Sequence, residues 1–168
     1  LEKDIEAIEE FLREVDFRTV KFSSEMKRLR YLVEENFYYN IFDKYIEDEI
    51  LECLELAANF KFEFKSYMAA SKFYKDYALK TNDKKQYLEN FNQHVFIVAM
   101  YLADGDVALA KELMISMLEQ RLQPATPTFL NSGRSRRGEL VSCFLLEVGD
   151  SLNSINYIDS TAKQLSKI

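Results

Sequence analysis

The stretch YLENFNQHVFIVAMYLA, residues 87–103, decides the fold because it is the most apolar helical pattern in the chain. A helix that is apolar on nearly all sides has to be covered by other elements. We therefore expect this helix at the centre of a helical core, with His94 packed on its apolar face. The sequence Asp-Gly-Asp at 104–106 then predicts a turn in which an aspartate caps the next helix.

Amphipathic patterns lie on both sides of that stretch in the sequence. Apolar residues recur at helical spacing, and charged residues occupy the opposite face. The predicted helices span residues 2–15, 23–36, 47–60, 66–80 and 107–121, with a short helix or turn at 40–46. Ser23 or Ser24 is the expected cap of the second helix, and Cys53 lies beside the apolar stripe of 47–60. Residues 1–121 are therefore predicted to form a helical N-terminal domain.

The composition changes at Gln123. Residues 123–139, QPATPTFLNSGRSRRGE, contain both prolines, two of the four glycines and three arginines. We expect an extended or looped connector, and loops of this length are often functional. Arg134, Arg136 and Arg137 are most simply a solvated basic loop, although the forked donors of arginine also match phosphate oxygens.

A short apolar run follows the connector. Residues 140–148, LVSCFLLEV, are almost continuously apolar and are bounded by Gly138 and Gly149, which predicts a strand buried on both faces of a parallel sheet. Residues 150–168 then predict a helix, capped by Asp150, Ser151 or Asn153. A lone strand cannot satisfy its own backbone donors and acceptors, so its neighbours must come from another chain or a longer protein. The expected fold class is mainly α, with one strand of an incomplete α/β unit in residues 122–168.

Composition and charge exclude several functions. The net charge of −6 and pI near 5.0 argue against binding to nucleic acid backbones, which requires clustered Lys and Arg. No apolar run reaches the length of a membrane span, and no secretory signal is visible. Two distant cysteines and a single histidine predict a reducing, cytoplasmic setting and no zinc site.

Two groups of residues could carry chemistry. Cys143 is either a small apolar core residue or a redox thiol, and Ser142 and the Thr-Pro-Thr loop could add hydroxyl donors to a ligand beside it. The sequence Asp150-Ser151-Leu152 is either a plain helix start or a nucleotide contact. A helix N-terminus attracts phosphate, and an aspartate there could accept from a ribose hydroxyl.

Residues 122–152, LQPATPTFLNSGRSRRGELVSCFLLEVGDSL, resemble the large (alpha) subunit of class I ribonucleotide reductase, and most closely its class Ib form. The upstream segments FKFEFKSYMAASKFYKDYALKT and YLADGDVALAKELM are also similar to that subunit's helical region. The resemblance implies a helical N-terminal domain followed by a ten-stranded α/β barrel whose first strand carries Ser142 and Cys143. It also implies reduction of ribonucleoside diphosphates to deoxyribonucleoside diphosphates by thiyl-radical chemistry.

The resemblance assigns roles residue by residue. Cys143 corresponds to one member of the redox pair, and Thr126 and Ser142 to substrate-binding positions. Asp150, Ser151 and Leu152 correspond to part of an allosteric site for deoxynucleoside triphosphates or ATP, and helix 154–167 to a homodimer contact. The implied partners are a metal-containing beta subunit that supplies the radical and a glutaredoxin- or thioredoxin-like reductant, with no cofactor bound directly.

The resemblance also implies that the radical cysteine and the partner of Cys143 lie beyond Ile168. We therefore expect the 168 residues to be inactive alone. The alternative is a helical protein-interaction module with a structural cysteine. The chemistry-rich loop favours the enzyme, because a scaffold has little need for Thr-Pro-Thr, Arg-Ser-Arg-Arg and Ser-Cys in succession.

Overall fold

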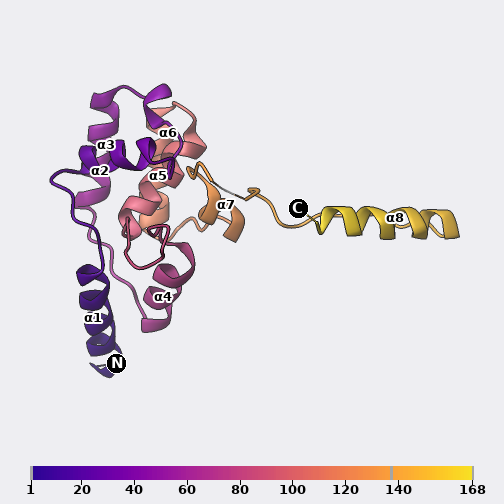
Figure 1. Cartoon of the computed structure of the whole chain (residues 1–168), viewed down its shortest axis with the longest axis horizontal. Coiled ribbons are helices and arrows are strands. Elements are labelled where there is room, and N and C mark those ends of the chain that lie inside the picture. The colour runs from indigo at the N-terminus through magenta and orange to yellow at the C-terminus, as the bar shows by residue number, and fades with distance from the viewer. Residues whose placement is uncertain (1, 137, 168) are drawn as a thin grey trace.

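The computed structural model describes residues 2–136 and 138–167, and it is mainly helical (Figure 1). Eight α-helices, one 3₁₀ turn and one π turn are present among these residues. In chain order they are α1 (Glu2–Phe17), α2 (Glu25–Glu34), η1 (Ile41–Asp43), α3 (Glu47–Asn59), α4 (Tyr67–Lys72), η2 (Phe73–Tyr77), α5 (Phe91–Ala103), α6 (Val107–Leu118), α7 (Thr126–Asn131) and α8 (Leu152–Leu165).

Helix α5 lies at the centre of the core, as its sequence predicts. Residues 95–100 are fully buried, and the helix packs against α3 and α6. The predicted start at residue 87 is wrong, because α5 begins only at Phe91. The Asn90 side chain accepts a hydrogen bond from the Gln93 N–H at 2.9 Å, and the Gln93 side chain accepts from the Asn90 N–H at 2.8 Å. This reciprocal cap sets the N-terminal start of α5 at Phe91.

The other helix boundaries follow from local capping. Ser24, Ser66 and Asp106 each accept a hydrogen bond from a backbone N–H three residues later, which confirms the predicted serine and aspartate caps at 24 and 106. Asp104 ends α5 in the left-handed region with φ of 46°. The Tyr45 hydroxyl holds this turn, because it donates to the Met100 carbonyl at 2.8 Å and accepts from the Gly105 N–H at 2.9 Å.

The predicted loop at 123–139 contains a helix, which corrects the sequence-based prediction. Helix α7 starts at Thr126 with Pro127 in its first turn, where the missing N–H of proline costs nothing. Phe129 is buried in the core. Gly133 then turns the chain with φ of +78°, and a Cβ at this position would lie 2.7 Å from Ile97 Cγ1. The close approach of this turn to α5 therefore requires glycine.

After Gly133 the chain returns to the segment before η1. The Tyr39 N–H donates to the Gly133 carbonyl at 3.0 Å, and the Ser135 N–H donates to the Phe37 carbonyl at 3.0 Å. Tyr38 and Arg134 form an isolated antiparallel bridge. Residues that are almost a hundred positions apart are thereby joined, and the connector is fixed to the helical body as far as Ser135.

The predicted strand at 140–148 is not formed in the part of the chain that the structure describes. The segment is extended, but among the described residues it has no partner strand and makes no ladder, so its backbone groups lack the inter-strand partners that a sheet would supply. Helix α8 follows and is drawn away from the helical body in Figure 1. None of its described residues is buried. The core therefore ends before residue 138, and the barrel strand expected here is absent from the structure.

No helix in the described residues combines the length and apolar character that a membrane crossing requires.

Candidate functional site

The residues expected to bind substrate lie on α7 and on the extended segment after it. Thr126 is exposed at the first position of α7, and its Oγ1 accepts a hydrogen bond from the Tyr77 hydroxyl at 3.3 Å. Thr128 Oγ1 donates to the Leu140 carbonyl at 3.0 Å, and the Asn131 side chain donates to the Glu139 carbonyl at 2.9 Å. Helix α7 thus holds the start of the segment that leads to Ser142 and Cys143.

Ser142 and Cys143 are both exposed. The Ser142 Oγ and Cys143 Sγ atoms lie 4.0 Å apart, and no described residue covers the thiol. The reading of Cys143 as a buried core residue is therefore wrong for this structure. Cys53, in contrast, is buried in α3 as expected, and burial raises the pKa of its thiol.

The residues expected to bind an effector form the N-terminus of α8. Ser151 is the cap, and its Oγ accepts from the Ser154 N–H at 3.1 Å, which confirms one of the three predicted caps. Asp150 and Leu152 are exposed. The main clefts on the described residues are lined by other side chains, and none of them includes Thr126, the Ser142–Cys143 pair or this cap.

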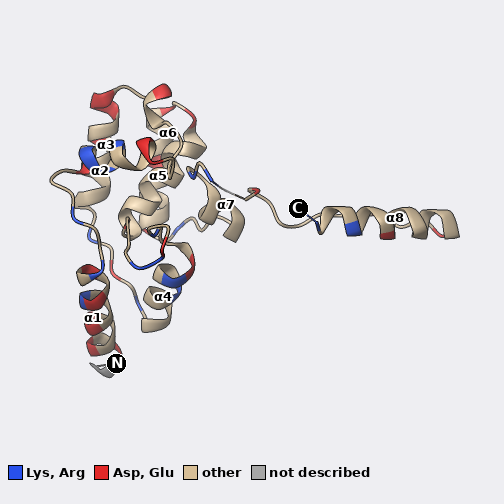
Figure 2. Ribbon diagram, in the orientation of Figure 1, with Lys and Arg blue, Asp and Glu red and all other residues tan. Residues whose placement is uncertain are grey.

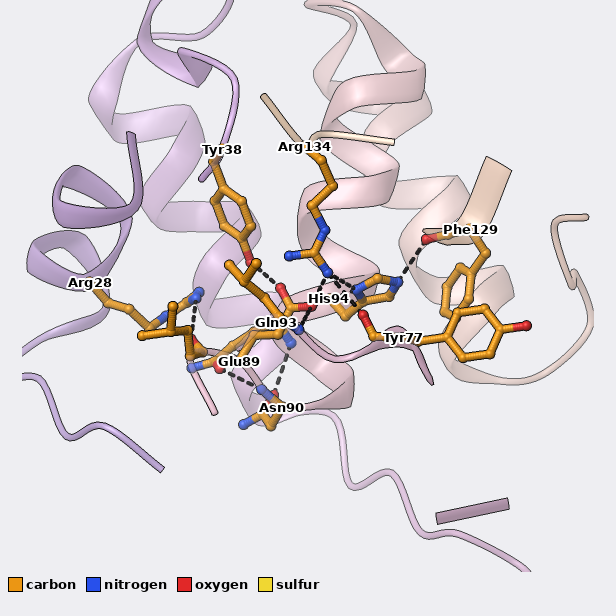
Figure 3. Close-up of polar contacts among 11 residues, drawn as sticks. Arg28, Tyr38, Tyr77, Glu89, Asn90, Gln93, His94, Phe129 and Arg134 are labelled. Carbon is orange, nitrogen blue, oxygen red and sulfur yellow. Dashed lines mark hydrogen bonds and ion pairs between the residues drawn. The ribbon is translucent and has the colours of Figure 1, made fainter. Parts of the chain in front are cut away.

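The helical body contains a buried polar network centred on Glu89 (Figure 3). Glu89 is 1% exposed and precedes the cap of α5. Its carboxylate accepts hydrogen bonds from the Tyr38 hydroxyl and from the Leu79 N–H, the latter at 2.9 Å. It also forms an ion pair with Arg134 and lies 2.7 Å from His94 Nδ1. Four separate segments therefore meet at one carboxylate.

His94 and Arg134 extend the network toward α7 and η2. His94 Nε2 lies 2.8 Å from the Phe129 carbonyl oxygen, so the imidazole bridges Glu89 and α7. The Arg134 guanidinium donates to the Tyr77 carbonyl at 3.1 Å, and Arg134 is only 8% exposed. A buried arginine of this kind requires a compensating anion, which Glu89 provides.

The electrostatics of the network keep Glu89 ionised. Burial alone would raise the pKa of Glu89, but the charges of Arg134 and His94 and the hydrogen bonds from His94 and Tyr38 hold this pKa well below its usual range. Burial and the neighbouring Glu89 carboxylate raise the pKa of the Tyr38 phenol. Tyr38 is therefore a neutral donor. Glu89 and His94 are shielded from solvent, and the network connects α7 and the Gly133 turn to the helical body.

Sequence reasoning missed most of this network. It placed His94 in the core, which is correct, but it read Arg134 as part of a solvated loop, which is wrong because the side chain is buried against Glu89. Arg136 is exposed as expected, and Arg137 lies outside the described residues. Glu89 and Tyr38 were not singled out. The available signal was an acid placed within the most apolar stretch of the chain, just before the cap of α5.

Comparison with known proteins assigns a class to this fold. Residues 1–62 match the family model described as ribonucleotide reductase N-terminal, and residues 63–137 match the one described as ribonucleotide reductase, all-alpha domain. The chain therefore belongs to the ribonucleotide reductase family.

The relatives are alpha subunits of ribonucleoside-diphosphate reductases. The chain is 50% identical over 169 aligned residues to the NrdEB subunit alpha of Bacillus subtilis, covering 99% of this chain and 16% of that protein. It is 49% identical to another B. subtilis alpha subunit, covering 24% of it, and 42% identical to the Mycoplasma pneumoniae alpha subunit, covering 23%. The chain thus spans about a quarter or less of these relatives. The resemblance to the class Ib alpha subunit is confirmed, and the match lies in its amino-terminal, helical region.

Proposed function

We propose that this chain forms the amino-terminal part of an alpha subunit that reduces ribonucleoside diphosphates to deoxyribonucleoside diphosphates. One observation carries the proposal: 99% of the chain aligns with a ribonucleoside-diphosphate reductase alpha subunit at 50% identity. The division into a helical domain, 1–121, and the start of a barrel, 122–168, is part of the same proposal. In a complete barrel, the apolar segment 140–148 would gain the partner strands that it lacks here.

In the proposed reaction, a thiyl radical from elsewhere in the subunit takes the 3′ hydrogen of the ribose. The 2′ hydroxyl leaves as water, and Cys143 and a second thiol together give up two electrons and two protons and become a disulfide. The 3′ hydrogen then returns to the sugar. Thr126 and Ser142 would bind the substrate beside Cys143, since both residues are exposed and carry hydroxyl groups.

The proposed regulation and partners follow from the same alignment. Asp150, Ser151 and Leu152 would contact a deoxynucleoside triphosphate or ATP effector at the N-terminus of α8, and α8 would contribute to a homodimer. A metal-containing beta subunit would supply the radical, and a glutaredoxin- or thioredoxin-like protein would reduce the disulfide. The proposed setting is the cytoplasm.

The test uses a polypeptide in which this sequence replaces the matching region of an alpha subunit, so that it is joined to the rest of the barrel. CDP reduction is measured with a beta subunit and a thiol reductant, and effector binding is measured separately. Replacement of Cys143 by Ser should abolish multiple turnover and leave effector binding unchanged, because the thiol would act only in the redox step. The variant Cys53→Ser is the matched control and should retain turnover. Full activity of Cys143→Ser would overturn the proposed role of Cys143. The 168 residues alone should show no turnover.

A further inference from the structure

A basic cleft lies between η2, the loop that follows it and the end of α7. The cleft has a volume of about 480 Å³. The cationic residues that line it are Lys75, Lys80, Lys84, Arg134 and Arg136. Asp76 is the single acid among the described lining residues. Basic segments are visible beside α4 and in the adjacent loop in Figure 2. This local concentration of cations contrasts with the net charge of −6 of the whole chain.

Most of this positive charge is not neutralised within the chain. Asp76 is paired with Lys72, which does not line the cleft, and Arg134 is paired with the buried Glu89. Lys75, Lys84 and Arg136 are exposed and form no ion pair with the described residues. These three side chains are therefore available to an anion from solvent.

The pKa of Lys80 indicates the electrostatic environment of the cleft. Lys80 is half-buried, and its Nζ donates to the Lys75 carbonyl at 2.7 Å, which leaves further N–H donors on the ammonium group. Burial lowers the pKa of Lys80, and the positive charges of Arg18 and Lys84 lower it further against the opposing effect of Asp76. The cleft thus holds an excess of positive charge, which a bound anion would relieve.

The turn that carries Lys84 is held in place by its own hydrogen bonds. Thr81 Oγ1 accepts from the Gln86 N–H at 3.2 Å, and the Asp83 carboxylate accepts from the Lys85 N–H at 3.1 Å. Asp83 is therefore engaged inside the turn and does not line the cleft. Lys84 has φ of +58°, and its N–H donates to the Thr81 carbonyl at 2.7 Å. Lys84 therefore lines the cleft, whereas the neighbouring Asp83 does not.

We propose that this cleft binds a small anion that carries two or more linked phosphate groups. Three separate segments contribute free cations, so a chain of phosphates can meet more of them than a single phosphate can. Lys and Arg form charge-assisted hydrogen bonds to phosphate oxygens. A long nucleic acid would be repelled by the acidic remainder of the chain, whereas a small anion would contact the cleft alone. The inference does not depend on the proposed function, because it uses none of the residues assigned a role there.

The test is calorimetric titration of the 168-residue chain with inorganic tripolyphosphate at low, fixed ionic strength. The triple variant Lys75→Gln, Lys84→Gln, Arg136→Gln should bind at least about tenfold more weakly, because three charge-assisted contacts are removed. The matched control is Lys27→Gln, Lys65→Gln, Lys167→Gln. It removes the same charge from exposed residues outside the cleft and should keep the affinity of the parent chain.

A further arm identifies the part of the ligand that is recognised. ATP should bind with an affinity similar to that of tripolyphosphate, and adenosine should not bind. Circular dichroism checks the fold of each variant, and the single variant Lys84→Gln, which should also bind more weakly, replaces the triple variant if helix is lost. The proposal is overturned if the parent chain does not bind tripolyphosphate at millimolar concentration. Equal weakening by both triple variants, or adenosine binding as tight as ATP binding, would overturn it too.

Discussion

At the scale of single residues, Glu89 is the centre of the buried polar network. It is buried, ionised and contacted by side chains or backbone from four segments. Such a group stabilises a fold only while its partners remain, because a buried charge without a partner is costly. Glu89 therefore couples the position of α7 to the position of α5 and of Tyr38.

Replacing Glu89 by Gln should lower the free energy of unfolding by about 3–5 kcal/mol, because Arg134 would remain buried without its anion. Urea unfolding followed by circular dichroism measures this loss at about pH 7. The control is Glu112→Gln, a substitution at an exposed residue of α6 with no ion pair among the described residues. Equal stabilities of the two variants would show that the network contributes little.

The same carboxylate predicts a pH dependence. Its folded-state pKa lies far below the reference value of 4.5, so its contribution is fully present above about pH 4.5 and is lost as the pH falls toward the folded-state pKa. The free energy of unfolding of the parent chain should therefore decrease below about pH 4.5 more steeply than that of Glu89→Gln. Parallel curves for the two proteins would contradict this assignment.

At the scale of secondary-structure elements, the Gly133 turn determines how α7 meets α5. A side chain here would face Ile97 Cγ1 at 2.7 Å and the Ile97 carbonyl oxygen at 3.0 Å, and its backbone would also have a positive φ. The steric contact with Ile97 and the positive φ would both destabilise any residue other than glycine at this position. Any other residue at position 133 would therefore require α7 to shift away from the core.

Gly133→Ala should destabilise the chain by about 1–3 kcal/mol, because the turn must either distort or move from α5. Gly138→Ala is the control, since a Cβ there would meet its nearest neighbour, Asn131 Nδ2, at an ordinary 3.4 Å. Thermal unfolding of both variants tests the difference. A Gly133→Ala variant as stable as the control would show that the turn adapts without cost.

Sequence predicted the elements whose causes are local. The apolar pattern of residues 95–100 identified the central helix, and serine and aspartate side chains identified the caps at 24, 106 and 151. Helix α7 was missed because the prolines and glycines of residues 123–139 indicated a loop, while the position of the helix depends on Phe129 reaching the core. The Glu89 network was missed because Tyr38 and Arg134 lie 51 and 45 residues away, and no local pattern reports such pairs. For the candidate site residues, the sequence provided a family resemblance, and their assembly into one site stays a prediction.

At the scale of the whole molecule, the chain has a packed helical body and an uncovered C-terminal region. Exposed apolar side chains continue from the extended segment into α8, where Leu145 is fully exposed and Leu152 is 73% exposed. The backbone groups of 140–148 also lack ladder partners among the described residues. An unpaired apolar segment of this kind favours association with another chain.

We therefore expect the chain to self-associate through residues 140–148. Size-exclusion chromatography with light scattering should show a mass that rises with concentration, and the variant Phe144→Lys, Leu145→Lys should suppress this rise. The control variant Met68→Lys, Leu109→Lys changes exposed apolar residues of the helical body and should behave like the parent chain. A parent chain that stays monomeric at high concentration would contradict the expectation.

The Glu89 network also bears on how modular this part of the protein is. The two family models meet between residues 62 and 63, yet Tyr38 belongs to the first matched stretch and Glu89, His94 and Arg134 belong to the second. Helix α3 from the first stretch likewise packs on α5 from the second. The border between the two stretches runs through a shared interior, so neither half could be exchanged between relatives as an independent building block without also matching the buried contacts that it makes with the other half.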